Sequence, residues 1–174
     1  MTKNASNASR LGIDLASRSE EELFKWFLAC LLFGKPIQTE IAERAWRELI
    51  KARLINPAAI SRAGWGKLVS LLDRAHYVRY ATKLLEVCQE LKRRYGTLTS
   101  LLAQAETPAD LSRRLQEFKH IGPVTARIFF REIRPIWYGS AASSRRTYRG
   151  RLQTLAGTVS SSEPNPTISM HSKL

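Results

Sequence analysis

A glycine–proline turn between two helical patterns carries the most specific chemistry in this sequence. Gly122 can adopt a positive φ, and Pro123 fits the first turn of a helix. Residues 121–125 are therefore expected to present backbone N–H groups at a helix N-terminus. Such a turn binds an anion, because the unpaired amides and the positive end of the helix dipole both attract negative charge.

Basic residues follow this turn at helical spacing. Arg127, Arg131 and Arg134 lie at i, i+4 and i+7, which puts them on one face of the helix. Residues 111–151 contain ten Lys and Arg against two acidic residues, so this segment holds +8 of the formal net charge of +13. A helix–helix turn without any ligand is the alternative, but the clustered arginines favour a phosphate site.

Composition limits the class of protein and its partner. The 174 residues include 28 Lys and Arg against 15 Asp and Glu, so a polyanion, with nucleic acid first, is the expected partner. The hydrophobic content of 44% is too high for a wholly disordered basic protein. Cys30 and Cys88 have no neighbouring Cys or His, which excludes a zinc or iron–sulfur motif and a disulfide framework. We therefore expect no metal and no cofactor, and we expect both cysteines in the core.

No segment has the pattern of a membrane span or of a signal peptide. The apolar run at residues 23–33 is too short to cross a bilayer and contains Lys25. The sequence therefore predicts a soluble, monomeric, intracellular protein without a membrane partner. A cytoplasmic location follows, with association to the nucleoid if the source is bacterial.

Three regions differ in composition: a polar leader at residues 1–19, a middle region at 20–138, and a Ser- and Arg-rich tail at 139–174. The leader and the tail lack a sustained apolar period and are expected to be disordered. The middle region holds nearly all the aromatic residues. It shows helix signals throughout and no strand signals, so it predicts a compact all-α domain.

Helix signals in the middle region can be placed individually. Ser19 and Glu22 form a capping box ahead of an apolar helix, and further helices are expected from Thr39, Pro57 and Pro108. A long helix is expected from about residue 74 to residue 94, with Asp73 as its N-cap. The sequence Gly64-Trp65-Gly66 predicts a loop. Its Trp side chain either packs back on the helices, which we favour, or offers its ring to a flipped base.

The segment at residues 118–126, Phe-Lys-His-Ile-Gly-Pro-Val-Thr-Ala, resembles a known motif. It is similar to the helix-hairpin-helix of the endonuclease III-like base-excision DNA glycosylases, whose usual form is Leu-Pro-Gly-Val-Gly-Arg-Lys-Thr-Ala. The resemblance covers about residues 23–137, including an apolar first helix and a long helix that ends at Gly96. It implies a compact helical bundle or six-helix barrel that binds duplex DNA through the phosphate backbone. It also implies that the second domain of these proteins is missing.

The chain departs from the family at the positions that carry its chemistry. Val124 stands where the bifunctional members have a lysine that forms a Schiff base with the sugar, and about Ala142 stands where the catalytic aspartate is expected. Glu132 is a poor substitute for that acid, and the cysteine loop that binds an iron–sulfur cluster is missing. His120 replaces the first hairpin glycine. Lys35 aligns with a glutamine that enters the vacated base position, although a solvated loop lysine is the favoured interpretation.

The turn, the charge and the resemblance together assign a set of DNA-binding residues and no catalytic residue. The set is Lys119, His120, Ile121, Gly122, Val124, Thr125, Arg127, Arg131 and Lys35. The sequence thus predicts a DNA-binding helix-hairpin-helix protein of the glycosylase superfamily that is catalytically impaired or truncated.

Two other functions stay open. One is an active monofunctional glycosylase with an unrecognised catalytic acid, and the other is a non-enzymatic helical bundle that binds protein or RNA. The change of composition at Gly139 also fits the loss of a downstream region through a frameshift or truncation.

Overall fold

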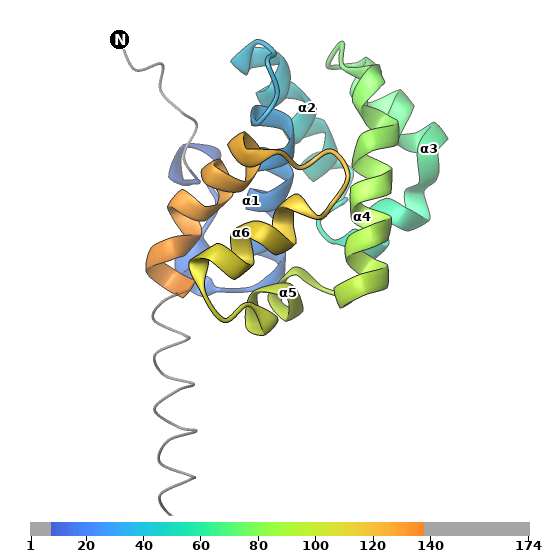
Figure 1. Ribbon diagram of the computed structural model, residues 1–174. Helices are drawn as coiled ribbons and strands as arrows, with labels where there is room; N and C mark the ends of the chain where they lie inside the picture. Colours follow the sequence, from blue (N-terminus) through green and yellow to red (C-terminus); the bar gives the residue numbers. More distant parts are fainter. Residues whose placement is uncertain (1–7, 138–174) are drawn as a thin grey trace, which may run out of the picture. The chain divides into compact units, whose positions relative to one another are not determined.

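The computed structural model describes residues 8–137, which form helices and no strand (Figure 1). The elements are η1 (Ser9–Leu11), η2 (Leu15–Ser17), α1 (Glu20–Phe33), α2 (Thr39–Lys51), α3 (Pro57–Asp73), η3 (Val78–Tyr80), α4 (Ala81–Tyr95), α5 (Leu98–Gln104) and α6 (Pro108–Gln116). A further helix begins at residue 123 and continues to residue 137. The all-α prediction is confirmed for this part of the chain. Within it, no helix has the length and apolar character needed to cross a membrane.

Helix α1 forms the centre of the core. Its N-cap is the predicted one, since Ser19 Oγ accepts the N–H of Glu22 at 3.3 Å. Every residue from Leu23 to Leu32 except Lys25 is buried. A helix that is apolar on nearly all sides must be enclosed, and Figure 1 shows α1 in the middle of the other helices.

The start of the described chain also belongs to the core. Ile13 and Leu15 are buried, and the short helices η1 and η2 lie on either side of Gly12. The prediction of a disordered leader over residues 1–19 is therefore wrong for residues 8–19. Buried side chains here come from single 3-10 turns, which have no helical period that the sequence pattern could show. The remaining leader residues and the predicted tail lie outside the described residues.

Helices α3 and α4 differ from the sequence-based prediction within α3 and at the junction between the two helices. Gly64 has φ 74° and ψ 176°, so α3 kinks there instead of ending in a loop. The next residue, Trp65, is 57% exposed, although its indole N–H donates to Thr82 of α4, so the expectation that it packs back on the helices is met only in part. His76 has a positive φ of 57°, which delays the start of α4 to Ala81. Asp73 is accordingly the last residue of α3 and not the N-cap of α4.

Six residues, 117–122, join α6 to the helix over residues 123–137 and form the hairpin turn. Phe118 and Ile121 anchor this turn, because both side chains are buried in the core. In Figure 1 the turn lies between the yellow helix α6 and the orange helix that follows it.

The helix over residues 123–137 is fixed to the core along one face. Phe129, Ile133 and Trp137 are buried there. Two indole N–H groups tie the helix to its surroundings: Trp26 donates to the Phe129 carbonyl at 3.3 Å, and Trp137 donates to the Leu102 carbonyl at 3.1 Å. The opposite face of this helix therefore points to solvent.

Candidate nucleic-acid interface

A left-handed residue lies in the hairpin turn, but it is not the glycine that the sequence suggests. His120 has φ 77°, whereas Gly122 does not have a positive φ. A non-glycine residue in this conformation costs about 1–2 kcal/mol. Two contacts offset that cost: His120 Nε2 lies 2.6 Å from Glu86 Oε2, and the His120 carbonyl accepts a hydrogen bond from Lys35 Nζ at 2.7 Å. His120 therefore takes the backbone conformation that a glycine would adopt most easily at the same position.

Glu86 in α4 holds two of the predicted site residues. Besides its contact with His120, Glu86 Oε2 lies 3.2 Å from Lys119 Nζ. The hydrogen bonds from His120 and Lys119 lower the pKa of the Glu86 carboxyl group. Both side chains are thus attached to α4 in this structure. Sequence reasoning missed Glu86, because 34 residues separate it from His120 and no local pattern marks it.

Lys35 lies beside the hairpin turn. Its side chain is partly buried, and its ammonium group donates to the His120 carbonyl. Desolvation, together with the nearby positive charge of Lys83, lowers the pKa of Lys35. The interpretation of Lys35 as a solvated loop lysine is therefore wrong. Lys35 connects the end of α1 to the turn.

The first turn of the helix over residues 123–137 packs closely against the end of α1. A Cβ at Gly34 would lie 2.1 Å from Thr125 Oγ1 and 2.8 Å from the Cys30 carbonyl oxygen, so only glycine fits there. Thr125 is 2% exposed and Ile121 is 5% exposed. These exposures include the backbone atoms, and the N–H of Ile121 already donates to the Phe118 carbonyl at 3.1 Å, so both predicted site residues belong to the interior.

Backbone donors are available where this helix begins. The first helical hydrogen bond runs from the N–H of Ala126 to the Gly122 carbonyl at 3.1 Å. The N–H groups of Val124 and Thr125 come before it and have no acceptor within their own helix, as at the start of any α-helix. No atom lies within 4 Å of the position that a Cβ on Gly122 would occupy, so the backbone is open to an approaching group.

The outer face of the same helix is basic. Arg127, Arg131 and Arg134 are all exposed, and Val124, three residues before Arg127, is 47% exposed. Arg131 Nε lies 3.4 Å from Glu132 Oε1, whereas Arg127 forms no ion pair with any residue in the described part of the chain. Residues three apart on a helix share one side, so the side chains of Val124 and Arg127 lie on the same face at the start of this helix.

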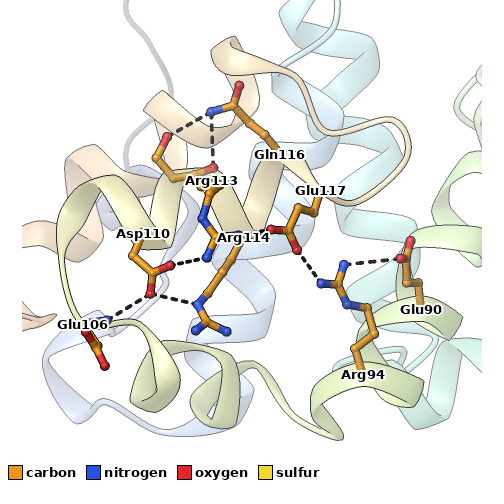
Figure 2. A network of polar contacts seen from close by, with 9 residues as sticks. Glu90, Arg94, Glu106, Asp110, Arg113, Arg114, Gln116 and Glu117 are labelled. Carbon is orange, nitrogen blue, oxygen red and sulfur yellow. Dashed lines mark hydrogen bonds and ion pairs between the residues drawn. The ribbon is translucent and has the colours of Figure 1, made fainter.

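The bases of α6 are already paired. Figure 2 shows Asp110 between Arg113 and Arg114, and Glu117 between Arg113 and Arg94 of α4. The contacts with Arg114 and then Arg113 lower the pKa of Asp110 to about 2, and Arg94 foremost lowers the pKa of Glu117. Arg113 and Arg114, which count toward the net charge of +8 in residues 111–151, are thereby neutralised. Among the described residues of this segment, the remaining positive charge lies on the helix over residues 123–137.

The potential metal ligands of residues 8–137 do not cluster. This part of the chain contains no group of three or more His, Cys, Asp or Glu side chains placed to hold a metal ion. Cys30 and Cys88 are fully buried, as expected for core residues, and burial raises the pKa of both thiols. Ala142, at the position expected for a catalytic acid, lies outside the described residues.

Comparisons with known proteins give no relative for this chain. A scan against protein-family models, a search of curated proteins and a search of solved structures each found no match. The resemblance of residues 118–126 to a helix-hairpin-helix motif therefore stays a prediction from the sequence.

Proposed function

We propose that this chain binds duplex DNA through the phosphate backbone. The binding surface would consist of the backbone of Gly122 and Val124 together with the side chains of Arg127 and Arg131, and we name it the hairpin surface. The observation that carries the proposal is the helix-start amide of Val124, a residue that is 47% exposed, on the same helix face as Arg127, an exposed arginine that forms no ion pair within residues 8–137. A phosphate at this place would accept from the amides, gain from the helix dipole and be neutralised by the guanidinium.

Binding of this kind is independent of base sequence. Few exposed side chains at the hairpin surface have both a donor and an acceptor for reading base edges, so affinity would come from phosphate contacts and the release of counterions. By resemblance, the chain would be a member of the base-excision repair glycosylase superfamily. As part of the same proposal it is monomeric and cytoplasmic.

The proposal includes no base excision by the route that the similar glycosylases use. The exposed side chain of Val124 has no nucleophilic atom, so it cannot form a covalent intermediate with a sugar. Ala142 also stands where the catalytic aspartate is expected, so the chain as given would bind DNA without cleaving the glycosidic bond.

A salt series tests the proposal directly. The affinity for a short duplex is measured for the unaltered chain and for Arg127→Ala and Arg131→Ala at several salt concentrations. Each substitution should weaken binding to different duplex sequences alike and should reduce the salt slope by about one. Arg47→Ala, which removes an exposed charge from α2, is the matched control. The hairpin surface is not the binding site if the two hairpin variants keep the affinity and the salt slope of the unaltered chain.

A further inference from the structure

We propose that Trp65 is a stacking platform for an unpaired base, so that the chain binds a single-stranded nucleic acid segment beside its hairpin surface. The inference rests on the proposed function for the position of the strand, since the hairpin surface would hold the adjoining phosphates. The inference adds base stacking on Trp65 of α3 to the phosphate contacts of the hairpin surface.

Trp65 differs from the other tryptophans of the chain in its exposure. It is 57% exposed, whereas Trp26, Trp46 and Trp137 are between 0% and 6% exposed. A large aromatic ring in water gives up the free energy that its burial would supply, so its exposure is not explained by packing. The kink at Gly64, with its positive φ, precedes this side chain directly.

The indole ring is held in place by a neighbouring helix. Trp65 Nε1 donates to Thr82 Oγ1 in α4 at 3.0 Å. This bond satisfies the one polar atom of the ring, so the exposed remainder of the ring is apolar. A ring with a fixed orientation and open apolar surface suits base stacking, which tolerates any sequence because every base has a π-face.

Helix α4 brings Trp65 close to the hairpin turn. Thr82, which binds Trp65, and Glu86, which binds His120, are four residues apart and so lie one turn apart on the same side of α4. Their separation along the helix axis is about 6 Å, at about 1.5 Å per residue. Successive nucleotides of a stacked strand are about 3.4 Å apart. The points on α4 that hold Trp65 and His120 are thus separated by about two nucleotide spacings along the helix axis.

The segment of the chain that carries Trp65 and Thr82 has a positive net charge, which favours a nucleic acid as the occupant. Residues 57–85 contain only one acid, Asp73, and five bases, all of which are exposed: Arg62, Lys67, Arg74, Arg79 and Lys83. An exposed aromatic ring on a basic segment is the combination that single-strand binding proteins use, with the bases on the ring and the phosphates near the cations.

Tryptophan emission provides a direct test. A thymidine oligonucleotide is titrated into the unaltered chain, and it should quench the emission of the one exposed tryptophan of residues 8–137. Trp65→Ala should weaken oligonucleotide binding about tenfold, and Trp65→Phe, which keeps a smaller ring, should weaken it less. Val78→Ala, which removes another exposed apolar side chain, is the control and should change the affinity much less. Circular dichroism establishes that each variant is folded.

The outcomes separate this inference from the proposed function. An unquenched emission, or a Trp65→Ala variant that binds the oligonucleotide as the unaltered chain does, overturns the stacking platform and favours a protein partner for this surface. If duplex binding still depends on Arg127 in that case, the proposed function is retained. The reverse pattern, oligonucleotide binding that depends on Trp65 with duplex binding that does not depend on Arg127, supports the platform and contradicts the proposed function.

Discussion

Lys35 Nζ lies 2.7 Å from the carbonyl oxygen of His120, across 85 residues of sequence. This hydrogen bond attaches the end of α1 to the hairpin turn at its left-handed residue. The residue before it, Gly34, is in close contact with Thr125 on the other side of the turn. Two consecutive residues after α1 therefore fix the backbone that would meet a phosphate.

Removing the Lys35 ammonium group should destabilise the turn. Lys35→Met keeps most of the stem but leaves the His120 carbonyl without its charged donor, and the free energy of unfolding should fall by about 1 kcal/mol, since the group is only partly buried. Urea titration measures the loss. Lys67→Met, on the exposed surface of α3, is the control, and equal stability of the two variants would contradict the role given to Lys35.

Gly34 should tolerate no side chain. In Gly34→Ala the new methyl group meets Thr125 Oγ1 and the Cys30 carbonyl oxygen, and we expect a loss of about 2–3 kcal/mol of unfolding free energy from overpacking. Thermal unfolding measures it. A variant as stable as the unaltered chain would show that α1 and the helix over residues 123–137 are not in contact at this point.

Gly122 should behave in the opposite way. Gly122→Ala adds a methyl group in open space at an ordinary φ, so stability should change by less than about 1 kcal/mol. Duplex DNA should nevertheless bind more weakly, because the methyl group stands where a phosphate would approach the amides. Binding and thermal unfolding are measured on the same preparation. Unchanged duplex affinity in this folded variant would move the phosphate contact away from the turn.

The ion pairs of Asp110 should account for part of the loss of folding stability at low pH. The pKa of this group is lowered from its usual value of 3.8 to about 2 by Arg114 and Arg113. A lowered pKa in the folded state stabilises the fold above the usual pKa, and this stabilisation is lost as the pH falls from about 4 to about 2. The unfolding temperature of Asp110→Asn should therefore fall less over this interval than that of the unaltered chain. Asp73→Asn is the control. If the unfolding temperatures of the two variants fall equally over this pH interval, the ion pairs of Asp110 do not cause the loss of stability.

A lysine at residue 124 tests the resemblance to the glycosylase hairpin. Val124 is 47% exposed, so Val124→Lys places an amine at the helix start without disturbing the core. Its nitrogen should condense with the aldehyde of an abasic site in duplex DNA, releasing water, and borohydride should reduce the resulting imine to a stable covalent product. Gel electrophoresis detects the product. Val124→Arg has the same charge without a nucleophilic amine, and equal yields from the two variants would show that the abasic sugar does not reach this position.

Local patterns in the sequence determined most of the helices and several of their ends. The apolar run of α1, the cap at Ser19, the start of α6 at Pro108 and the arginine stripe each follow from residues within a few positions of one another, so they can be read without the fold. The same reasoning placed both cysteines in the core, where they are found.

Tertiary contacts decided which residue of the turn is left-handed and where Lys35 and Trp65 point. The positive φ of His120 depends on Glu86 and Lys35, 34 and 85 residues away, and the position of Trp65 depends on Thr82. Backbone strain and the orientation of side chains are set by the balance of such distant contacts, and neither propensity nor spacing along the chain contains that information.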